Sequence, residues 1–168
     1  GGRLLGAMSS RSVNKYTGVD PSLKTFNSLS RMSELINHNI EVDFINKPFE
    51  KTNLKHGEYD LAFSSPPYFN TEEYSYESTQ SFISHNTKDL WRDNFLSVLI
   101  SKCHSYIKHN GYLIINVANV KTYKDLERDT ISLCENTGFE LVKTYKMTLS
   151  SLMGKGFKYE PIFVFKKI

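Results

Sequence analysis

The chain has 168 residues, of which 39% are hydrophobic and 23% are charged, and its formal net charge is +3. This length fits one domain with a sizeable core, and no apolar run reaches the roughly 20 residues that a membrane-spanning helix needs. The two cysteines and five histidines are scattered and show no metal-binding spacing. We therefore expect a single domain over residues 1–168, in the cytoplasm, with buried free thiols and no metal.

Strand and helix patterns alternate along the chain, which predicts an α/β fold with a mainly parallel sheet and helices on both faces. The first expected elements are a helix at 2–11, a strand at 15–19, a helix opened by Asp20-Pro21-Ser22 and running to 36, and strands at 40–46 and 59–64. A helix capped by Asp89 and ended by Gly111 follows, and then a strand at 112–117. The last elements are a helix at 122–138, which begins with a Thr122 capping box and ends at Gly138, and strands at 139–148 and 162–165. The last two strands predict an antiparallel hairpin around a glycine loop at 153–157. The polar stretch 69–88 is long for a loop, and such loops are usually functional or mobile.

Positive charge is concentrated toward the end of the sequence. From Lys143 onward there are six lysines and one acidic residue, Glu160. A basic region of this kind can follow a phosphate backbone, although a charge run is also typical of a plain solvated face. The charge pattern leaves both interpretations open.

The tetrapeptide Ser65-Pro66-Pro67-Tyr68 directly follows the apolar strand predicted at 59–64. Two prolines after a buried strand end its hydrogen-bond ladder and hold the backbone in a rigid, extended turn. In a parallel sheet this turn lies at the carboxyl edge, where ligands of open α/β folds bind. A plain structural turn is the alternative.

This tetrapeptide resembles the signature of the S-adenosylmethionine-dependent amino-methyltransferases, which is Asp, Asn or Ser, then Pro-Pro, then an aromatic residue. The resemblance implies a Rossmann-like methyltransferase fold, S-adenosylmethionine as cofactor and Ser65, Pro66, Pro67 and Tyr68 as the catalytic residues. A fixed side-chain oxygen and a backbone carbonyl would accept the N–H bonds of an exocyclic amine and orient its lone pair, so that catalysis is mostly positioning. Tyr68 would stack on a base taken out of its duplex.

The same resemblance implies four cofactor-binding residues. The pair Gly1 and Gly2 opens a helix as in a nucleotide-binding unit, Asp20 ends the strand whose acidic residue binds the ribose, and Phe49 is placed to pack against the adenine. The alternatives without cofactor binding are a cloning remnant for the glycines, a helix N-cap for Asp20 and core packing for Phe49. We expect the first strand and the early cofactor loop upstream of Gly1, and we expect Asp20 and the Ser65 tetrapeptide to face one cleft.

Serine before Pro-Pro is commoner in family members that methylate cytosine N4, and Asp or Asn in those that methylate adenine N6. DNA is therefore the expected partner, with cytosine N4 as the first choice, adenine N6 as a close second, and RNA also compatible with the charge. The alternatives are methylation of RNA guanine or of a protein glutamine, and a non-catalytic subunit that binds nucleic acid or a partner. The sequence implies no oligomeric state.

Overall fold

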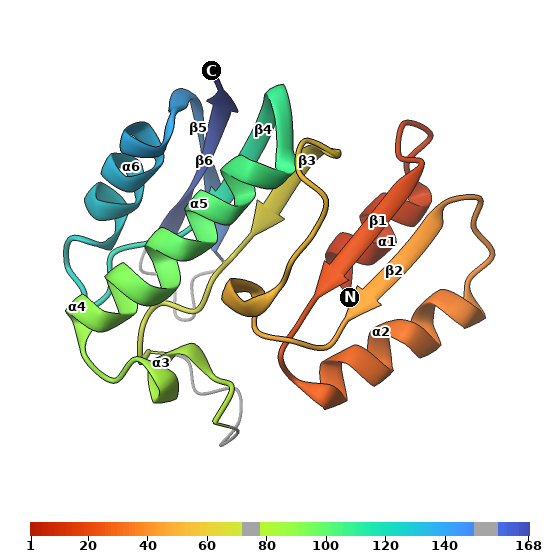
Figure 1. Cartoon of the computed structure of the whole chain (residues 1–168), viewed down its shortest axis with the longest axis horizontal. Coiled ribbons are helices and arrows are strands. Elements are labelled where there is room, and N and C mark those ends of the chain that lie inside the picture. Colours follow the sequence, from red (N-terminus) through yellow and green to blue (C-terminus); the bar gives the residue numbers. More distant parts are fainter. Residues whose placement is uncertain (72–77, 150–157) are drawn as a thin grey trace. The chain divides into compact units, whose positions relative to one another are not determined.

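The computed structural model describes residues 1–71, 78–149 and 158–168, which divide into two compact units (Figure 1). The described part of the first unit comprises 1–52 and 78–84, and that of the second comprises 53–71, 85–149 and 158–168. The glycine loop expected at 153–157 lies outside the described residues, as do residues 72–77 of the long polar stretch. The single domain expected over residues 1–168 stays a prediction.

The first unit is a strand–helix–strand arrangement preceded by a helix. Its elements are α1 (Gly2–Ser9), β1 (Lys15–Val19), α2 (Leu23–Leu35), β2 (Glu41–Ile45), the 3-10 turn η1 (Phe49–Lys51) and the short helix α3 (Ser81–Ser84). β1 and β2 are parallel neighbours, and the Phe44 ring on β2 packs edge-on against Tyr16 of β1 and Phe26 of α2. Phe26 thus connects α2 to the strand pair, whereas Leu23 and Leu35, predicted on the same apolar face of the helix, are 54% and 74% exposed.

The start of α2 differs from the prediction. Ser22 is the N-cap, and its hydroxyl accepts the Thr25 N–H at 3.4 Å. The Asp20 carboxylate instead accepts the Ser22 N–H at 2.9 Å, which forms a tight turn just before the helix. Asp20 therefore lies one turn ahead of the helix rather than at its cap.

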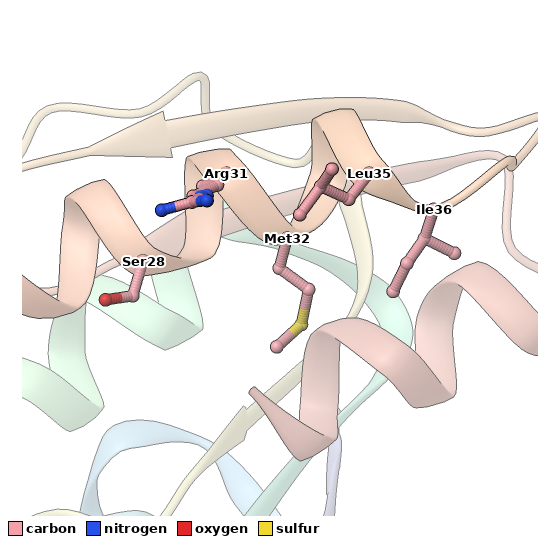
Figure 2. Close-up of a pocket in the computed structure, with 5 residues that line it drawn as sticks. All are labelled: Ser28, Arg31, Met32, Leu35 and Ile36. Atoms are coloured by element: carbon pink, nitrogen blue, oxygen red, sulfur yellow. The ribbon is translucent and has the colours of Figure 1, made fainter.

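An open pocket of about 340 Å³ runs along the second half of α2 (Figure 2). Its lining residues are Ser28, Arg31, Met32, Leu35 and Ile36. Met32 reaches the start of α1, where a Cβ on Gly1 would lie only 2.6 Å from the Met32 methyl carbon. The pocket is remote from Asp20, which precedes the opposite end of the helix, so it is not part of the predicted cofactor edge.

The second unit contains a four-stranded sheet in the order β3-β4-β6-β5 (Figure 1). Its elements are β3 (Tyr59–Ser64), α4 (Lys88–Trp91), the π-helical turn η2 (Arg92–Leu96), α5 (Ser97–Tyr106), β4 (Ile107–Asn116), α6 (Leu126–Thr137), β5 (Phe139–Leu149) and β6 (Lys158–Lys167). β3 and β4 are parallel, and β6 is antiparallel to both of its neighbours, so β3, β4 and β5 share one direction. The predicted α/β class, with parallel pairing and a C-terminal antiparallel hairpin, is confirmed.

The core of the second unit lies between this sheet and α5 and α6. The cross-strand neighbours Leu113 and Phe165, and Ile115 and Phe163, share one face of the sheet and are buried. Trp91 is fully buried among the rings of Phe69, Phe95 and Tyr123. This packing fixes the carboxyl ends of β3 and β4, where the sequence places its strongest motif.

Three helix ends in the second unit differ from the prediction, namely the start of α4, the end of α5 and the start of α6. The N-cap before α4 is Thr87, whose hydroxyl accepts the Leu90 N–H at 3.3 Å, and not Asp89. α5 ends at Tyr106, and Gly111 lies inside β4, where a Cβ would come within 2.9 Å of the Asp60 carbonyl oxygen. Gly111 is therefore required for close strand packing rather than for ending a helix.

The Thr122 capping box is also wrong. α6 begins after Asp125, whose side chain makes no capping bond. Instead, Asn119 and Glu127 bond reciprocally, since the Asn119 N–H donates to the Glu127 carboxylate at 2.9 Å and the Glu127 N–H donates to the Asn119 side-chain oxygen at 3.0 Å. The predicted end at Gly138 is confirmed, because Gly138 has a left-handed φ of 99° that favours glycine.

Candidate functional site

The strongest sequence motif lies where the sequence places it, at the carboxyl end of β3. Residues 65–68, called the Ser65 turn below, follow Ser64, which pairs with Ile115 on β4. The next residue of β4 is Asn116, so Ser65 and Asn116 lie at the same edge of the sheet. Ser65 is exposed, whereas Pro66 is buried. The turn thus presents its first side chain outward from a fixed backbone.

Asn116 holds the Ser65 hydroxyl. Asn116 is 6% exposed, and its side-chain amide nitrogen donates to the Pro161 carbonyl oxygen on β6 at 3.0 Å. The amide oxygen therefore faces Ser65 and accepts from the Ser65 hydroxyl at 3.4 Å. Because the hydroxyl proton is directed at Asn116, the Ser65 oxygen is oriented to act as an acceptor toward a third group.

Tyr68 is anchored at its far end. Only 7% of its surface is exposed, and its hydroxyl donates to the Glu160 carboxylate on β6 at 3.2 Å. The Ser65 turn is therefore connected to β6 twice, through Asn116 and through Tyr68. Stacking of Tyr68 on a base would require this ring to become uncovered.

The residue after the turn, Phe69, has a left-handed backbone with φ of 56°. This conformation is unfavourable for a bulky side chain and is found where the surroundings enforce it. The Phe69 ring is buried edge-on against Trp91, with centroids 6.1 Å apart, and its N–H donates to the Pro67 carbonyl oxygen at 3.0 Å. The hydrophobic core therefore imposes a sharp bend on the chain just after the Ser65 turn.

Two of the predicted cofactor-binding residues lie at the carboxyl edge of the first unit. The Asp20 N–H donates to the Ile45 carbonyl oxygen, and the Asn46 side-chain amide donates to the carbonyl oxygens of Asp20 and Pro21 at 3.0 and 3.1 Å. Phe49 follows in η1, half-buried, and its carbonyl oxygen accepts the Thr52 hydroxyl at 2.7 Å. Neighbouring strand ends thus bring Asp20 and Phe49 to one edge.

The glycine pair lies at the start of α1, as predicted. Gly1 is the N-cap of α1 and Gly2 is its first residue. A Cβ on Gly1 would collide with the Met32 side chain, whereas a Cβ on Gly2 would meet no atom within 4 Å. Gly1 and Gly2 belong to the first unit, and the Ser65 turn belongs to the second, so the common cleft for the cofactor and the turn stays a prediction.

Sequence reasoning missed Asn116 and Glu160 as parts of this site. Each carried a signal. Asn116 is the polar residue in the otherwise apolar strand predicted at 112–117, and Glu160 is the one acidic residue after Lys143. A polar group is retained in a buried strand when it has a specific partner, which here is the pair Ser65 and Pro161.

Neither cysteine is suited to act as a nucleophile. Burial raises the pKa of the Cys103 thiol to about 12, and burial also raises the pKa of the Cys134 thiol. The described residues contain no group of three or more His, Cys, Asp or Glu side chains that could hold a metal ion. Within the same part of the chain, no helix combines the length and apolar character needed to cross a membrane.

Several solved structures with the same fold are methyltransferases. An S-adenosylmethionine-dependent methyltransferase from Methanosarcina mazei is 12% identical over 92% of this chain and 82% of that protein, with a TM-score of 0.60. Magnesium protoporphyrin IX methyltransferase from Synechocystis PCC 6803, solved with bound cofactor, is 17% identical over 94% of this chain and 62% of that protein, with a TM-score of 0.60.

A protein from Thermus thermophilus, provisionally assigned as a DNA modification methylase, is 17% identical over 72% of this chain and 50% of its own length, with a TM-score of 0.53. The sequence matches no protein-family model and no curated protein. These similarities show that the chain has the Rossmann-like fold of S-adenosylmethionine-dependent methyltransferases.

Proposed function

We propose that this protein is an S-adenosylmethionine-dependent methyltransferase that methylates an exocyclic amine of a nucleic-acid base. The observation that carries the proposal is the Ser65 turn, which lies at the carboxyl edge of β3 in a methyltransferase fold with its serine oxygen oriented as an acceptor. Ligands of open α/β folds bind at this edge.

The chemistry follows from the nature of the acceptor. The lone pair of an exocyclic amine is delocalised into the base, which makes the nitrogen a poor nucleophile. The Ser65 oxygen accepts one N–H of the amine, and a backbone carbonyl of the turn accepts the other, so the nitrogen becomes more tetrahedral and its lone pair is directed outward. Because Asn116 and the two prolines fix these acceptors in advance, the rate gain comes from positioning and electrostatic preorganisation.

The residues at the edge of the first unit fit the cofactor. S-adenosylmethionine, when bound, would supply the methyl group of its sulfonium and leave as S-adenosylhomocysteine, and the methylated amine would give up one proton to solvent. The Asp20 carboxylate is a strong acceptor for ribose hydroxyls, and the half-buried Phe49 ring, which follows the neighbouring strand, offers an apolar surface for adenine. Gly1 and Gly2 lie at the start of α1, beside Met32 in the second half of α2, and their part in cofactor binding stays a prediction.

Cytosine N4 is the first expected target and adenine N6 the second. A serine hydroxyl provides one neutral acceptor atom, where an aspartate provides two charged ones. DNA is the expected substrate, RNA and a protein glutamine are the alternatives, and a non-catalytic binding subunit is the alternative without chemistry.

Methyl transfer from labelled S-adenosylmethionine tests the proposal. The intact protein is incubated with single-stranded and duplex DNA, with RNA and with protein, and the modified nucleoside is identified by mass spectrometry. We expect N4-methylcytosine in DNA, and we expect Ser65→Ala to lower kcat more than it raises KM, since the lost acceptor matters most in the transition state.

Tyr68→Phe is the matched control, because it removes the bond to Glu160 and keeps the aromatic ring. It should retain more activity than Tyr68→Ala, which also removes the ring that stacks on the base and should bind nucleic acid about tenfold to a hundredfold more weakly with nearly unchanged cofactor affinity. Unchanged transfer in Ser65→Ala would assign the turn a structural role only, and label found only in protein would contradict the nucleic-acid substrate.

A further inference from the structure

The hairpin β5–β6 extends beyond the rest of its sheet. β4 pairs with β6 only from Ile162 to Lys166, whereas β5 pairs with β6 along the whole length from Lys158 to Lys167. Residues 143–149 and 158–161, called the hairpin arm below, therefore include a two-stranded part that continues past the carboxyl end of β4. This is the edge at which the Ser65 turn lies.

The register of the strands places one exposed aromatic residue in line with the site. Asn116, Ile162 and Tyr145 are successive partners across β4, β6 and β5, so their side chains lie in one row on one face of the sheet. Two strand spacings separate Tyr145 from Asn116, which is about 10 Å. Asn116 in turn bonds Ser65, so Tyr145 and the Ser65 hydroxyl lie on the same side of the sheet edge.

The arm combines exposed aromatic rings with positive charge. Tyr145 is 50% exposed, and the Lys143 ammonium lies 4.5 Å from the centre of its ring. Tyr159 is 55% exposed and, like Lys146, lies on the opposite face of the arm. Glu160 is the one acidic residue of the arm, and its carboxylate already accepts the Tyr68 hydroxyl.

We propose that the hairpin arm binds the unpaired nucleic-acid strand on either side of the target base, with Tyr145 stacking on a neighbouring base and Lys143 and Lys146 contacting phosphates. This inference rests on the proposed function and names the surface that recognises its substrate. Exposed aromatic rings next to cations are the features by which proteins hold single strands, since every base has a face to stack and every phosphate a charge to pair. In this arrangement Tyr145 stacks on a neighbouring base, and the buried Tyr68 is the residue that stacks on the target base itself.

Binding of a fluorescent single-stranded oligonucleotide of mixed sequence, followed by anisotropy over a salt series, tests the arm. We expect Tyr145→Ala to weaken binding about tenfold and to leave the salt dependence unchanged. Lys143→Gln and Lys146→Gln should each reduce the slope of log affinity against log salt by about 0.7, because each removes one phosphate contact to a single strand.

Two control variants lie outside the hairpin arm. Tyr112→Ala removes a tyrosine that is 40% exposed in the middle of β4, where the pairing of β4 with β6 begins, and Lys55→Gln removes an exposed lysine before β3. Both should bind the oligonucleotide as the unaltered protein does. Arm variants that bind as tightly as these controls would overturn the arm proposal and leave the methyl-transfer proposal standing. If the unaltered protein neither binds nor methylates any nucleic acid, both proposals fail.

Discussion

In the second unit, Trp91 packs among three aromatic rings, and residues of β4 and β6 hold the Ser65 turn, whereas the first unit fixes its strand ends mainly through local hydrogen bonds. Among the described residues, Leu4 is the one large apolar side chain of the first unit that is buried, and α2 contains no buried residue. Asp20 is held by Ser22, Ile45 and Asn46, all close to it on neighbouring segments.

The difference indicates that the two units meet different structural requirements. A group that must orient a reacting amine needs a rigid support, and the core of the second unit supplies one. A carboxylate that binds a cofactor needs only a correctly bent backbone, and local turn bonds supply that. Substitutions should therefore affect stability mainly in the second unit, and cofactor affinity mainly in the first.

The largest expected effect is the loss of the Trp91 ring. Trp91→Ala removes a fully buried side chain that contacts three aromatic rings and should lower the free energy of unfolding by about 3–5 kcal/mol. Urea denaturation followed by circular dichroism measures it. Leu35→Ala on α2, where the leucine is largely exposed, is the control and should cost less than about 0.5 kcal/mol. Equal losses would contradict the comparison.

Asn116→Ala should lower kcat for methyl transfer about tenfold, because the Ser65 hydroxyl loses the acceptor that orients it. It should also destabilise the protein by about 1–3 kcal/mol, since the Pro161 carbonyl loses its donor. A double-mutant cycle with Ser65→Ala separates the two effects. If Asn116 acts on the rate through Ser65, its substitution will not lower kcat further in the Ser65→Ala protein; a further tenfold loss would show that Asn116 has only a general structural role.

Asp20→Asn removes the negative charge at the carboxyl edge of the first unit and keeps a side-chain oxygen in its place. The asparagine oxygen can still accept the Ser22 N–H, so the start of α2 and the free energy of unfolding should stay unchanged. Affinity for S-adenosylmethionine, measured by calorimetry, should fall about tenfold, because a charged acceptor for the ribose hydroxyls becomes a neutral one. Unchanged affinity would remove Asp20 from the cofactor site.

The smallest expected effect is a pH dependence from His104. Burial, followed by the nearby Lys167 ammonium, lowers the pKa of His104 below its ordinary value of 6.5. The unfolded chain therefore binds a proton more readily, and the free energy of unfolding should decrease as the pH falls below 6.5 toward the lowered pKa. Urea midpoints on either side of this pH measure the decrease, and His104→Leu should flatten it. An equal or steeper decrease in that variant would assign the pH dependence to other groups.

Local patterns predicted much of the fold. The strands at 15–19 and 59–64 were predicted to the residue, because a proline, which cannot continue the hydrogen-bond ladder, stands two residues after the end of each. The end of α5 was mispredicted because Gly111 reads as a helix stop, while pairing of Ile107 with Tyr59 draws the preceding residues into β4. The partners of the Ser65 turn lie 51 and 92 residues further along the chain, at separations that local periodicity does not cover.

The π-helical turn at Arg92–Leu96 has a consequence for insertions and deletions. A π turn accommodates one extra residue within an otherwise regular helix, and each residue of an α-helix turns the chain by about 100°. Deleting a single residue between Trp91 and Ser97 would restore regular winding, and it would also rotate Trp91 out of the aromatic cluster that supports Phe69. In this segment the number of residues is as strongly constrained as their identity.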